Sequence, residues 1–276
     1  MRRRPPLLLL LPALLGAAFL LVPLLGVLAD VPWGDLAGRL TEPEVRQALG
    51  LSLRVSVLAL LVSLVLGVPL AWLLARVDFP GKTALRSLVL LPMVLPPTVA
   101  GIALLEGLGR RGLLGGALAS LGVTLPFSTA GAVVAAVFVA LPFLVISLEG
   151  ALVQLDPVFE EAAATMGAGP LRTLWHVTLP MTKPSLAAGA VLCWARALGE
   201  FGATLTFAGN LPGTTQTLPL HVYLLLQRDP AAATAVSLLL VAVAAAVLFA
   251  LRGRWLGNAR PAPRFSAAAV RRRPRR

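Results

Sequence analysis

The sequence is poor in the residues that soluble enzymes use for chemistry and for contact with water. Charged residues make up 13% of its 276 positions, and there are one cysteine and two histidines. A soluble globular domain has roughly a quarter charged residues. The single cysteine, Cys193, excludes an internal disulfide, and His176 and His221 lie too far apart in sequence to suggest a metal or catalytic cluster. The composition therefore argues against a soluble, disulfide-stabilised or metal-dependent enzyme.

The sequence also lacks a phosphate-binding loop for nucleotide hydrolysis. Such a loop needs the pattern G-x-x-x-x-G-K-[ST], and neither lysine, Lys82 or Lys183, follows such a run. No nucleophile and base stand in a recognisable arrangement. The chain is therefore predicted not to be an enzyme, with no cofactor or metal of its own, and energy for any active process must come from a partner.

What the sequence has in abundance is apolar residues, at 58% of positions and a mean hydropathy of +0.86. Several runs exceed the ~18 apolar residues that indicate a membrane span. Six spans are predicted, at about 7–29, 51–75, 87–108, 128–148, 185–207 and 231–251. Pro92, Pro96 and Pro97 should kink the third span, because each removes a backbone donor. A cleaved signal peptide is the alternative for the first run, but such peptides have apolar cores of roughly 7–15 residues. The fold class is an all-α integral membrane protein.

The basic residues are distributed unevenly over the predicted loops. With six spans both termini lie on one side, and that side holds seventeen of the 24 basic residues: Arg2, Arg3, Arg4, Arg76, Lys82, Arg86, Arg172, Lys183 and nine arginines between 252 and 276. The other side holds five, namely Arg39, Arg46, Arg110, Arg111 and Arg228. Cytoplasmic loops are enriched in Lys and Arg, so both termini are predicted to be cytoplasmic. A net charge of +12 arranged in this way lacks the basic face typical of nucleic-acid binding.

Residues 156–180, DPVFEEAAATMGAGPLRTLWHVTLP, interrupt the apolar runs on the predicted cytoplasmic side. Asp156 is a good N-cap, and Pro157 suits the first helical position. A helix is predicted from there until Gly167, followed by a second short helix that opens at Pro170 and stops before Pro180. The run of alanines leaves a smooth surface, which allows close backbone approach by another protein. An ordinary helical hairpin between two spans is the alternative.

The spacing in this segment resembles the EAA loop of ABC-importer permeases, whose pattern is E-A-A, three residues, G, nine residues, I-x-L-P. Here the matching residues are Glu161, Ala162, Ala163, Gly167, Val177, Leu179 and Pro180, and only Val177 departs from the pattern. The resemblance implies that the loop is a coupling helix that docks on a cytoplasmic ATPase subunit. It assigns coupling to Glu160, Glu161, Ala162, Ala163 and Gly167, with Leu179 and Pro180 closing the motif.

Two ionisable residues fall inside the predicted fifth span. Arg196 and Glu200 are four residues apart and so share one helical face. Charged residues in spans usually face a bundle interior or a water-filled route. Structural pairing and lining of a translocation path are both open readings. Thr204 and Asn210 follow with groups that can donate hydrogen bonds to an oxyanion, although small-residue helix packing also explains this stretch.

Residues 195–203 (ARALGEFGA) and 208–210 (AGN) resemble the sulfate/molybdate branch of importer permeases, and 212–220 (PGTTQTLPL) looks most like molybdate permeases. The resemblance implies a six-span type I permease that forms a homodimer in a bacterial or archaeal plasma (inner) membrane. It also implies two ATPase subunits carrying ATP and Mg²⁺, and an extracytoplasmic oxyanion-binding protein. The substrate expected is molybdate or tungstate. Sulfate or thiosulfate, a secondary anion transporter and a membrane-embedded enzyme or assembly factor are the alternatives.

On this interpretation the chain has three parts. Residues 1–50 hold the first span and an external linker, and residues 51–251 form the permease core. Residues 252–276 form a basic cytoplasmic tail that is expected to be disordered. Contact of this tail with anionic lipid headgroups and simple solvation are both open.

Overall fold

The computed structural model describes residues 7–256, and every regular element in that range is helical. The elements are α1 (Leu7–Asp30), α2 (Leu36–Leu40), α3 (Pro43–Arg76), α4 (Lys82–Val94), α5 (Pro97–Leu108), α6 (Gly115–Ser120), α7 (Thr129–Gln154), α8 (Val158–Thr165), α9 (Pro170–Thr173), the π-helical turn η1 (Leu174–Thr178), α10 (Leu179–Leu198), α11 (Gly202–Phe207), α12 (Leu218–Arg228) and α13 (Pro230–Leu256). Within the described range, α1, α3, α7 and α13 are long and apolar enough to cross a membrane. The predicted all-α membrane fold is confirmed, while the count of six spans stays a prediction.

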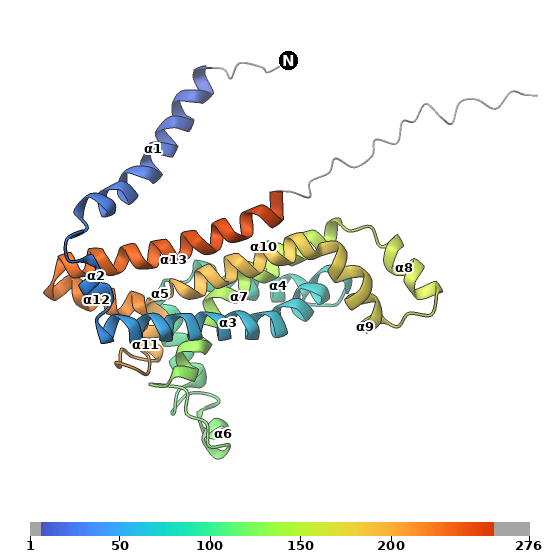
Figure 1. The fold of residues 1–276 in the computed structure, drawn as a ribbon. Helices are drawn as coiled ribbons and strands as arrows, with labels where there is room; N and C mark the ends of the chain where they lie inside the picture. The colour runs from blue at the N-terminus through green and yellow to red at the C-terminus, as the bar shows by residue number, and fades with distance from the viewer. Residues whose placement is uncertain (1–6, 257–276) are drawn as a thin grey trace, which may run out of the picture.

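The body of the molecule is a bundle in which α3, α7, α10 and α13 run alongside one another (Figure 1). The contact between α3, α7 and α10 is built from small residues, and Ala59, Ala132, Ala136 and Ala140 are completely buried there. Small side chains let helix backbones approach closely, which matters because lipid tails offer no hydrophobic drive for helices to associate. Larger side chains fill the rest of this core, among them the fully buried Leu74, Leu144 and Leu148.

Helix α1 extends away from this bundle (Figure 1). From Leu8 to Asp30 its side chains are exposed, with Val27 alone partly covered. Its composition is apolar throughout, so the physical partner for this surface is hydrocarbon rather than water. The predicted first span is therefore a helix that the rest of the described chain leaves uncovered.

The predicted third span is broken rather than kinked. Helix α4 ends at Val94, and α5 begins at Pro97 after two residues of extended backbone. Leu95 has φ −64° and ψ 135°, the conformation that a following proline favours. Since Pro96 and Pro97 also lack N–H groups, the helical hydrogen bonds cannot continue through this point.

The prediction of an uninterrupted fifth span over 185–207 is wrong in two respects. The helix begins earlier, at Leu179, and it ends at Leu198, after which α11 starts at Gly202. The break is stabilised by Glu200, whose Oε1 accepts a hydrogen bond of 2.9 Å from Ala203 N at the start of α11. A carboxylate that satisfies a free N–H in this way starts a new helix instead of extending the old one.

The second halves of the two broken segments, α5 and α11, pack tightly on each other. A Cβ atom on Gly101 would lie 2.5 Å from Thr206 Cβ and 3.0 Å from Ala203 O, and one on Gly202 would overlap Pro97. Both glycines are therefore required by close backbone approach. Beside them, Ala203 and Phe207 join the buried cluster that α5 and α7 also line.

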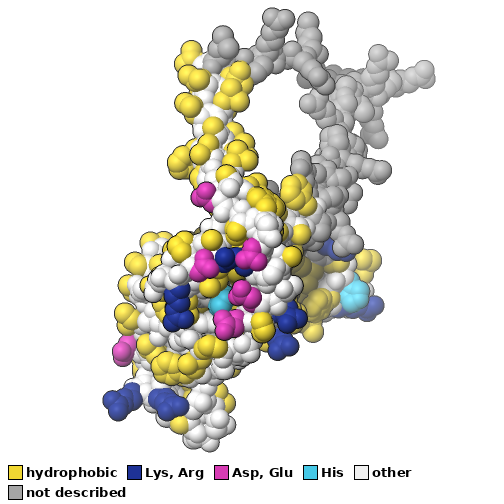
Figure 2. Space-filling view, turned by 60° about the vertical axis from the view of Figure 1, so that its left-hand side comes forward, with side chains coloured by type: hydrophobic (Ala, Val, Ile, Leu, Met, Phe, Trp, Pro, Cys, Tyr) yellow, Lys and Arg dark blue, Asp and Glu magenta, His cyan; other side chains and the backbone are white. Residues whose placement is uncertain are grey.

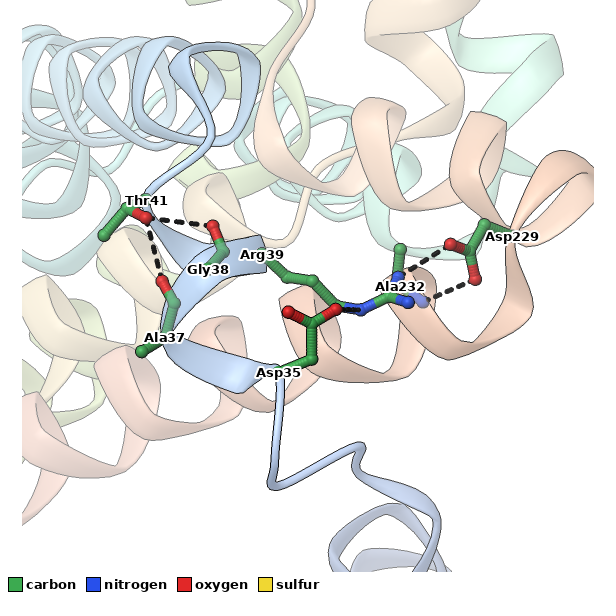
Figure 3. A network of polar contacts seen from close by, with 7 residues as sticks. All are labelled: Asp35, Ala37, Gly38, Arg39, Thr41, Asp229 and Ala232. Atoms are coloured by element: carbon green, nitrogen blue, oxygen red, sulfur yellow. Dashed lines mark hydrogen bonds and ion pairs between the residues drawn. The ribbon is translucent and has the colours of Figure 1, made fainter.

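Charged side chains gather at the end of the bundle where α2 and α12 lie, below the apolar α1 (Figure 2). Arg39 is the centre of one network there (Figure 3): its Nη1 donates to Asp229 Oδ2 at 2.7 Å, and its Nε donates to Asp35 Oδ2 at 3.0 Å. Asp229 Oδ1 in turn accepts from Ala232 N at 3.0 Å at the start of α13. The hydrogen bond from Arg39 lowers the pKa of Asp229, with a smaller effect from Ala232. The network ties the linker after α1 to the junction between α12 and α13.

Helix α13 continues to Leu256, five residues beyond the predicted end of the last span. The predicted basic tail therefore begins with residues that are helical. The rest of that prediction, for residues 257–276, and the arginines at 2–4 lie outside the described residues.

Candidate functional site

The segment with the EAA-like spacing lies at the end of the bundle opposite α2 and α12 (Figure 1). Asp156 Oδ1 accepts a hydrogen bond of 3.0 Å from Val158 N, the first N–H of α8, while Pro157 takes the N-cap position that was predicted for Asp156. Glu160 and Glu161 lie in the first turn of α8, near the positive end of its dipole. Helix α8 ends at Thr165, and the chain turns at Gly167, where φ is +85°.

Glu160 anchors α8 to two other elements. Its Oε2 lies 2.9 Å from Arg76 Nε at the end of α3, in an ion pair whose angle does not make a hydrogen bond. Its Oε1 accepts a hydrogen bond of 2.7 Å from the hydroxyl of Thr178, which is buried at the end of η1. Arg76 also donates from Nη2 to Leu155 O at 3.2 Å. These contacts fix α8 to α3 and to the start of α10.

The other predicted coupling residues divide into a buried and an exposed set. Ala163 is 4% exposed and faces the protein, while Glu161, Ala162 and Gly167 are exposed. Leu179 is buried and Pro180 is exposed at the start of α10. Ala162 and Gly167 present small groups at the surface of this segment, with the longer side chain of Glu161 beside them. The three exposed residues Glu161, Ala162 and Gly167 are called the exposed strip below, and its small groups allow close approach by another protein.

The prediction that the second short helix stops before Pro180 is wrong. The chain passes from α9 through η1 into α10 with helical dihedral angles at Thr178 and Leu179. Leu179 N donates to Leu174 O, five residues back, which is the π-helical pattern. Pro180 falls in the first turn of α10, where its missing N–H is tolerated because the wider turn has already displaced the hydrogen-bonding register.

Sequence reasoning missed the apolar side chains that border this strip. Met166, Leu171 and Trp175 are 82%, 70% and 61% exposed, and a shallow groove is lined by Gly169, Pro170, Leu171, Arg172, Trp175 and His176. Large exposed apolar side chains grouped together mark interaction surfaces. It also missed Arg76 and Thr178 as partners of Glu160. The signal that could have indicated the second partner is a glutamate before the alanine run together with a threonine just before α10, the residues that form this hydrogen bond.

A second ion pair, between an exposed arginine and a buried glutamate, lies near this end of the bundle. Arg86 of α4 donates from Nε to Glu149 Oε1 of α7 at 2.8 Å, and Glu149 is 9% exposed. Burial of a carboxylate at such a position requires a cation, and Arg86 supplies it. This pair fastens α4 to α7 in the same way that Arg76 fastens α3 to α8.

Of the four residues predicted to line a path, the structure brings two together. Arg196 Nη1 lies 2.7 Å from Glu200 Oε2, with side-chain exposures of 30% for Arg196 and 2% for Glu200. Thr204 is 1% exposed within α11, and Asn210 is half-buried just after it. Arg196 is thus the charged member of the set that remains accessible. Among residues 7–256, no three His, Cys, Asp or Glu side chains are grouped so as to hold a metal ion.

Comparison with known proteins identifies the family of the chain. A family model described as binding-protein-dependent transport system inner membrane component matches residues 67–257. The chain is 48% identical over 244 residues to the molybdenum transport system permease protein ModB of Mycobacterium tuberculosis, covering 88% of this chain and 92% of that protein. It is 46% identical to the protein of the same name in Escherichia coli K12, over 79% of this chain and 96% of that one. It is 35% identical to the sulfate transport system permease protein CysT of Salmonella typhimurium, over 81% of each.

Solved structures match the fold at lower sequence identity. A bacterial ABC transporter involved in the import of the acidic polysaccharide alginate superposes with a TM-score of 0.72 at 20% identity, covering 90% of this chain and 93% of that one. An inward-facing form of the MetNI methionine ABC transporter gives a TM-score of 0.58 at 19% identity, covering 78% of this chain and 98% of that one. At these identities the likeness establishes the arrangement of helices.

Proposed function

Because this chain belongs to the family of binding-protein-dependent transport system inner membrane components, a family of multi-pass membrane proteins, we propose that it is the permease subunit of an ATP-driven importer of molybdate or tungstate. The observation that carries the substrate is the difference in identity between relatives. The molybdenum permeases of M. tuberculosis and E. coli are 48% and 46% identical to this chain, whereas the sulfate permease of S. typhimurium is 35% identical.

The proposed assembly contains two copies of this chain, two cytoplasmic ATPase subunits and an extracytoplasmic oxyanion-binding protein. Both termini are cytoplasmic, and six spans are formed by α1, α3, the broken pair α4 and α5, α7, the pair α10 and α11, and α13. ATP and Mg²⁺ bind to the partner subunit, since the sequence has no phosphate-binding loop. This chain therefore supplies the route and the mechanical link, and it catalyses no reaction.

In this proposal α8 docks into the ATPase subunit and transmits its motion. The exposed strip of Glu161, Ala162 and Gly167 supports close contact because Ala162 and Gly167 have no long side chain, and the exposed Met166, Leu171 and Trp175 supply apolar area at its border. Closure of the ATPase pair on ATP draws the two α8 helices together. Since Glu160 holds α8 to Arg76 and Thr178, that motion passes to α3 and α10 and switches the bundle between two states.

The translocation path is proposed to pass Arg196, Glu200, Thr204 and Asn210. The break between α10 and α11 supports this placement, because broken helices in membrane proteins expose backbone groups that need a polar cavity or protein partners. A cation at the break attracts a tetrahedral dianion, and nearby hydroxyl and amide groups donate hydrogen bonds to it.

The test is ATP-dependent uptake by the chain reconstituted in liposomes with its ATPase and binding protein. We expect radiolabelled molybdate to accumulate only with ATP, tungstate to compete strongly, and sulfate to compete weakly. Strong competition by sulfate at equal concentration would favour the second candidate, a sulfate permease, which the 35% identity to CysT supports. Uptake driven by an ion gradient without any ATPase would identify a secondary transporter and refute the proposal.

A further inference from the structure

Arg196 and Glu200 form a pair whose two members differ sharply in accessibility. The side chain of Glu200 is 2% exposed, and that of Arg196 is 30% exposed. Oε1 of Glu200 accepts a hydrogen bond of 2.9 Å from Ala203 N, and Oε2 lies 2.7 Å from Arg196 Nη1 in an ion pair whose angle does not make a hydrogen bond. A passing ion can therefore reach the guanidinium of Arg196 but not the carboxylate of Glu200.

We propose that Glu200 is a positioning residue that holds Arg196 at the break and partly neutralises it, so that Arg196 attracts the oxyanion without trapping it. This inference rests on the proposed function, and it separates the roles of two residues that sequence reasoning grouped together. Arg196 contacts the anion. Glu200 acts through Arg196.

The physical reason is the strength of charge interactions away from bulk water. An arginine is always protonated, and the attraction between it and a dianion rises steeply as the surroundings lose water. A transport site must bind an ion well enough to admit it and weakly enough to release it. With a carboxylate 2.7 Å from the guanidinium, the net charge of the pair is zero, and the approaching dianion meets a dipole whose field falls off faster than that of a free cation.

The surroundings of the pair keep its geometry fixed. Glu200 also caps α11 through Ala203 N, so its carboxylate cannot rotate away without leaving that N–H unsatisfied. The next residue, Phe201, packs against Tyr223 of α12 with ring centroids 5.2 Å apart. Helix α12 therefore contacts the segment between α10 and α11 directly after Glu200.

The experiment uses the purified complex of this chain with its ATPase, in detergent and without the binding protein, so that only the permease can bind the anion. Radiolabelled molybdate is the probe for equilibrium binding, and uptake is measured in parallel in liposomes with the binding protein present. Glu200→Gln keeps a carbonyl oxygen for Ala203 N and removes the charge. We expect it to bind molybdate about tenfold more tightly than wild type and to show a maximal uptake rate several-fold lower.

Two further variants make the result specific. Arg196→Gln in the Glu200→Gln background should lose the tight binding and still transport slowly, because the attracting cation is gone. Glu149→Gln breaks another pair of an accessible arginine with a buried glutamate, located on α4 and α7 and not at the break, and should leave molybdate binding as in wild type. Complex yield and thermal stability are measured for all variants.

Unchanged molybdate binding in Glu200→Gln would overturn the inference, as would equal tightening in Glu149→Gln. If Glu200→Gln alone does not assemble, uptake by the double variant Arg196→Gln/Glu200→Gln tests the inference. Uptake at the wild-type rate in that variant would show that Arg196 is not needed and would overturn the inference. Absence of molybdate uptake by the wild-type complex is a separate result that refutes the proposed function itself.

Discussion

The ion pair between Arg76 and Glu160 joins the end of α3 to α8, two elements separated by more than eighty residues of sequence, with 2.9 Å between Nε and Oε2. The side chains of Arg76 and Glu160 are 14% and 19% exposed, so the pair is largely shielded from water. Hydrogen bonds and ion pairs in such surroundings contribute more than those on an open surface. In the proposed function, this pair is the link through which motion of α8 reaches the bundle.

Replacing Arg76 by alanine should weaken this link. The change leaves Glu160 with Thr178 as its partner. Because a shielded carboxylate then has no cation beside it, the free energy of unfolding should fall by roughly 1–3 kcal/mol. We expect ATP hydrolysis to continue while molybdate uptake falls by about tenfold or more, as an unfastened α8 no longer drives α3. The measurement is the ratio of molybdate transported to ATP hydrolysed.

The matched control for Arg76→Ala is Asp78→Asn. This change breaks an ion pair just after α3, between Lys82 Nζ and Asp78 Oδ1 at 2.9 Å. Unlike the side chains of Arg76 and Glu160, that of Asp78 is fully exposed. Surface pairs of this kind contribute little, so coupling should be unchanged. Equal loss of coupling in both variants would contradict the assigned role of Arg76.

Gly167→Asp should uncouple ATP hydrolysis from uptake. A Cβ atom at Gly167 meets nothing within 4 Å in this chain, so the new side chain projects into the surface proposed to contact the ATPase. The φ of +85° adds a modest conformational strain, which aspartate tolerates better than most residues. Gly81→Asp is the control, since Gly81 has φ +88° and equally open surroundings but lies outside the coupling segment. Equal coupling in the two variants would argue against docking at Gly167.

Gly101→Ala should destabilise the packing of α5 on α11. Its Cβ would approach Thr206 Cβ to 2.5 Å, and overpacking of this kind costs about 1–3 kcal/mol. Gly107→Ala, in the same helix, has nothing within 4 Å and should be neutral or slightly stabilising. Thermal unfolding of the purified complex measures both. A lower Tm for Gly107→Ala than for Gly101→Ala would contradict the close approach described for α5 and α11.

His221 should make the stability of α12 depend on pH. The side chain is 4% exposed, and its Nδ1 lies 3.3 Å from Gln216 Oε1. Burial lowers the pKa of His221, while Glu44 and Glu42 act in the opposite direction. Because the folded state binds the proton less readily than the unfolded state, this contribution to stability is present above the unfolded pKa of about 6.5 and is lost as the pH falls below it.

The corresponding measurement is thermal unfolding at about pH 7.5 and pH 5.5, which bracket the unfolded histidine pKa. Wild type should lose more stability between these values than His221→Gln, which cannot titrate. The control His176→Gln removes an exposed histidine and should keep the wild-type pH dependence. Identical pH dependence in wild type and His221→Gln would show that the burial of His221 does not govern this transition.

Much of this molecule could be predicted from its sequence because hydrophobic runs, cap residues and the spacing of the EAA-like segment are local features. The helix start at Asp156 and the turn at Gly167 are examples. The breaks at Leu95 and at Gly199 were harder, since a proline or glycine inside an apolar run is compatible with a kink as well as with a break. The pairing of Arg196 with Glu200, four residues apart, was one of the predicted readings, but partners far apart in the sequence were missed. Glu160 contacts Arg76, and Glu149 contacts Arg86, only after the helices have packed. Local sequence patterns cannot predict these contacts because the partners lie on different helices.

The most direct test of the central claim uses a cysteine placed at Ala162. The native Cys193 is completely buried, so a cysteine at exposed position 162 would react selectively with a short reagent that couples to a thiol at one end and carries a photoreactive group at the other, which bonds to any nearby protein in the assembled membrane complex. The account predicts a product that joins this chain to the ATPase subunit, with a yield that changes between ATP-bound and ATP-free states. Labelling of that cysteine from the outer face of sealed cells by a membrane-impermeant reagent, with no ATPase in any cross-linked product, would contradict it.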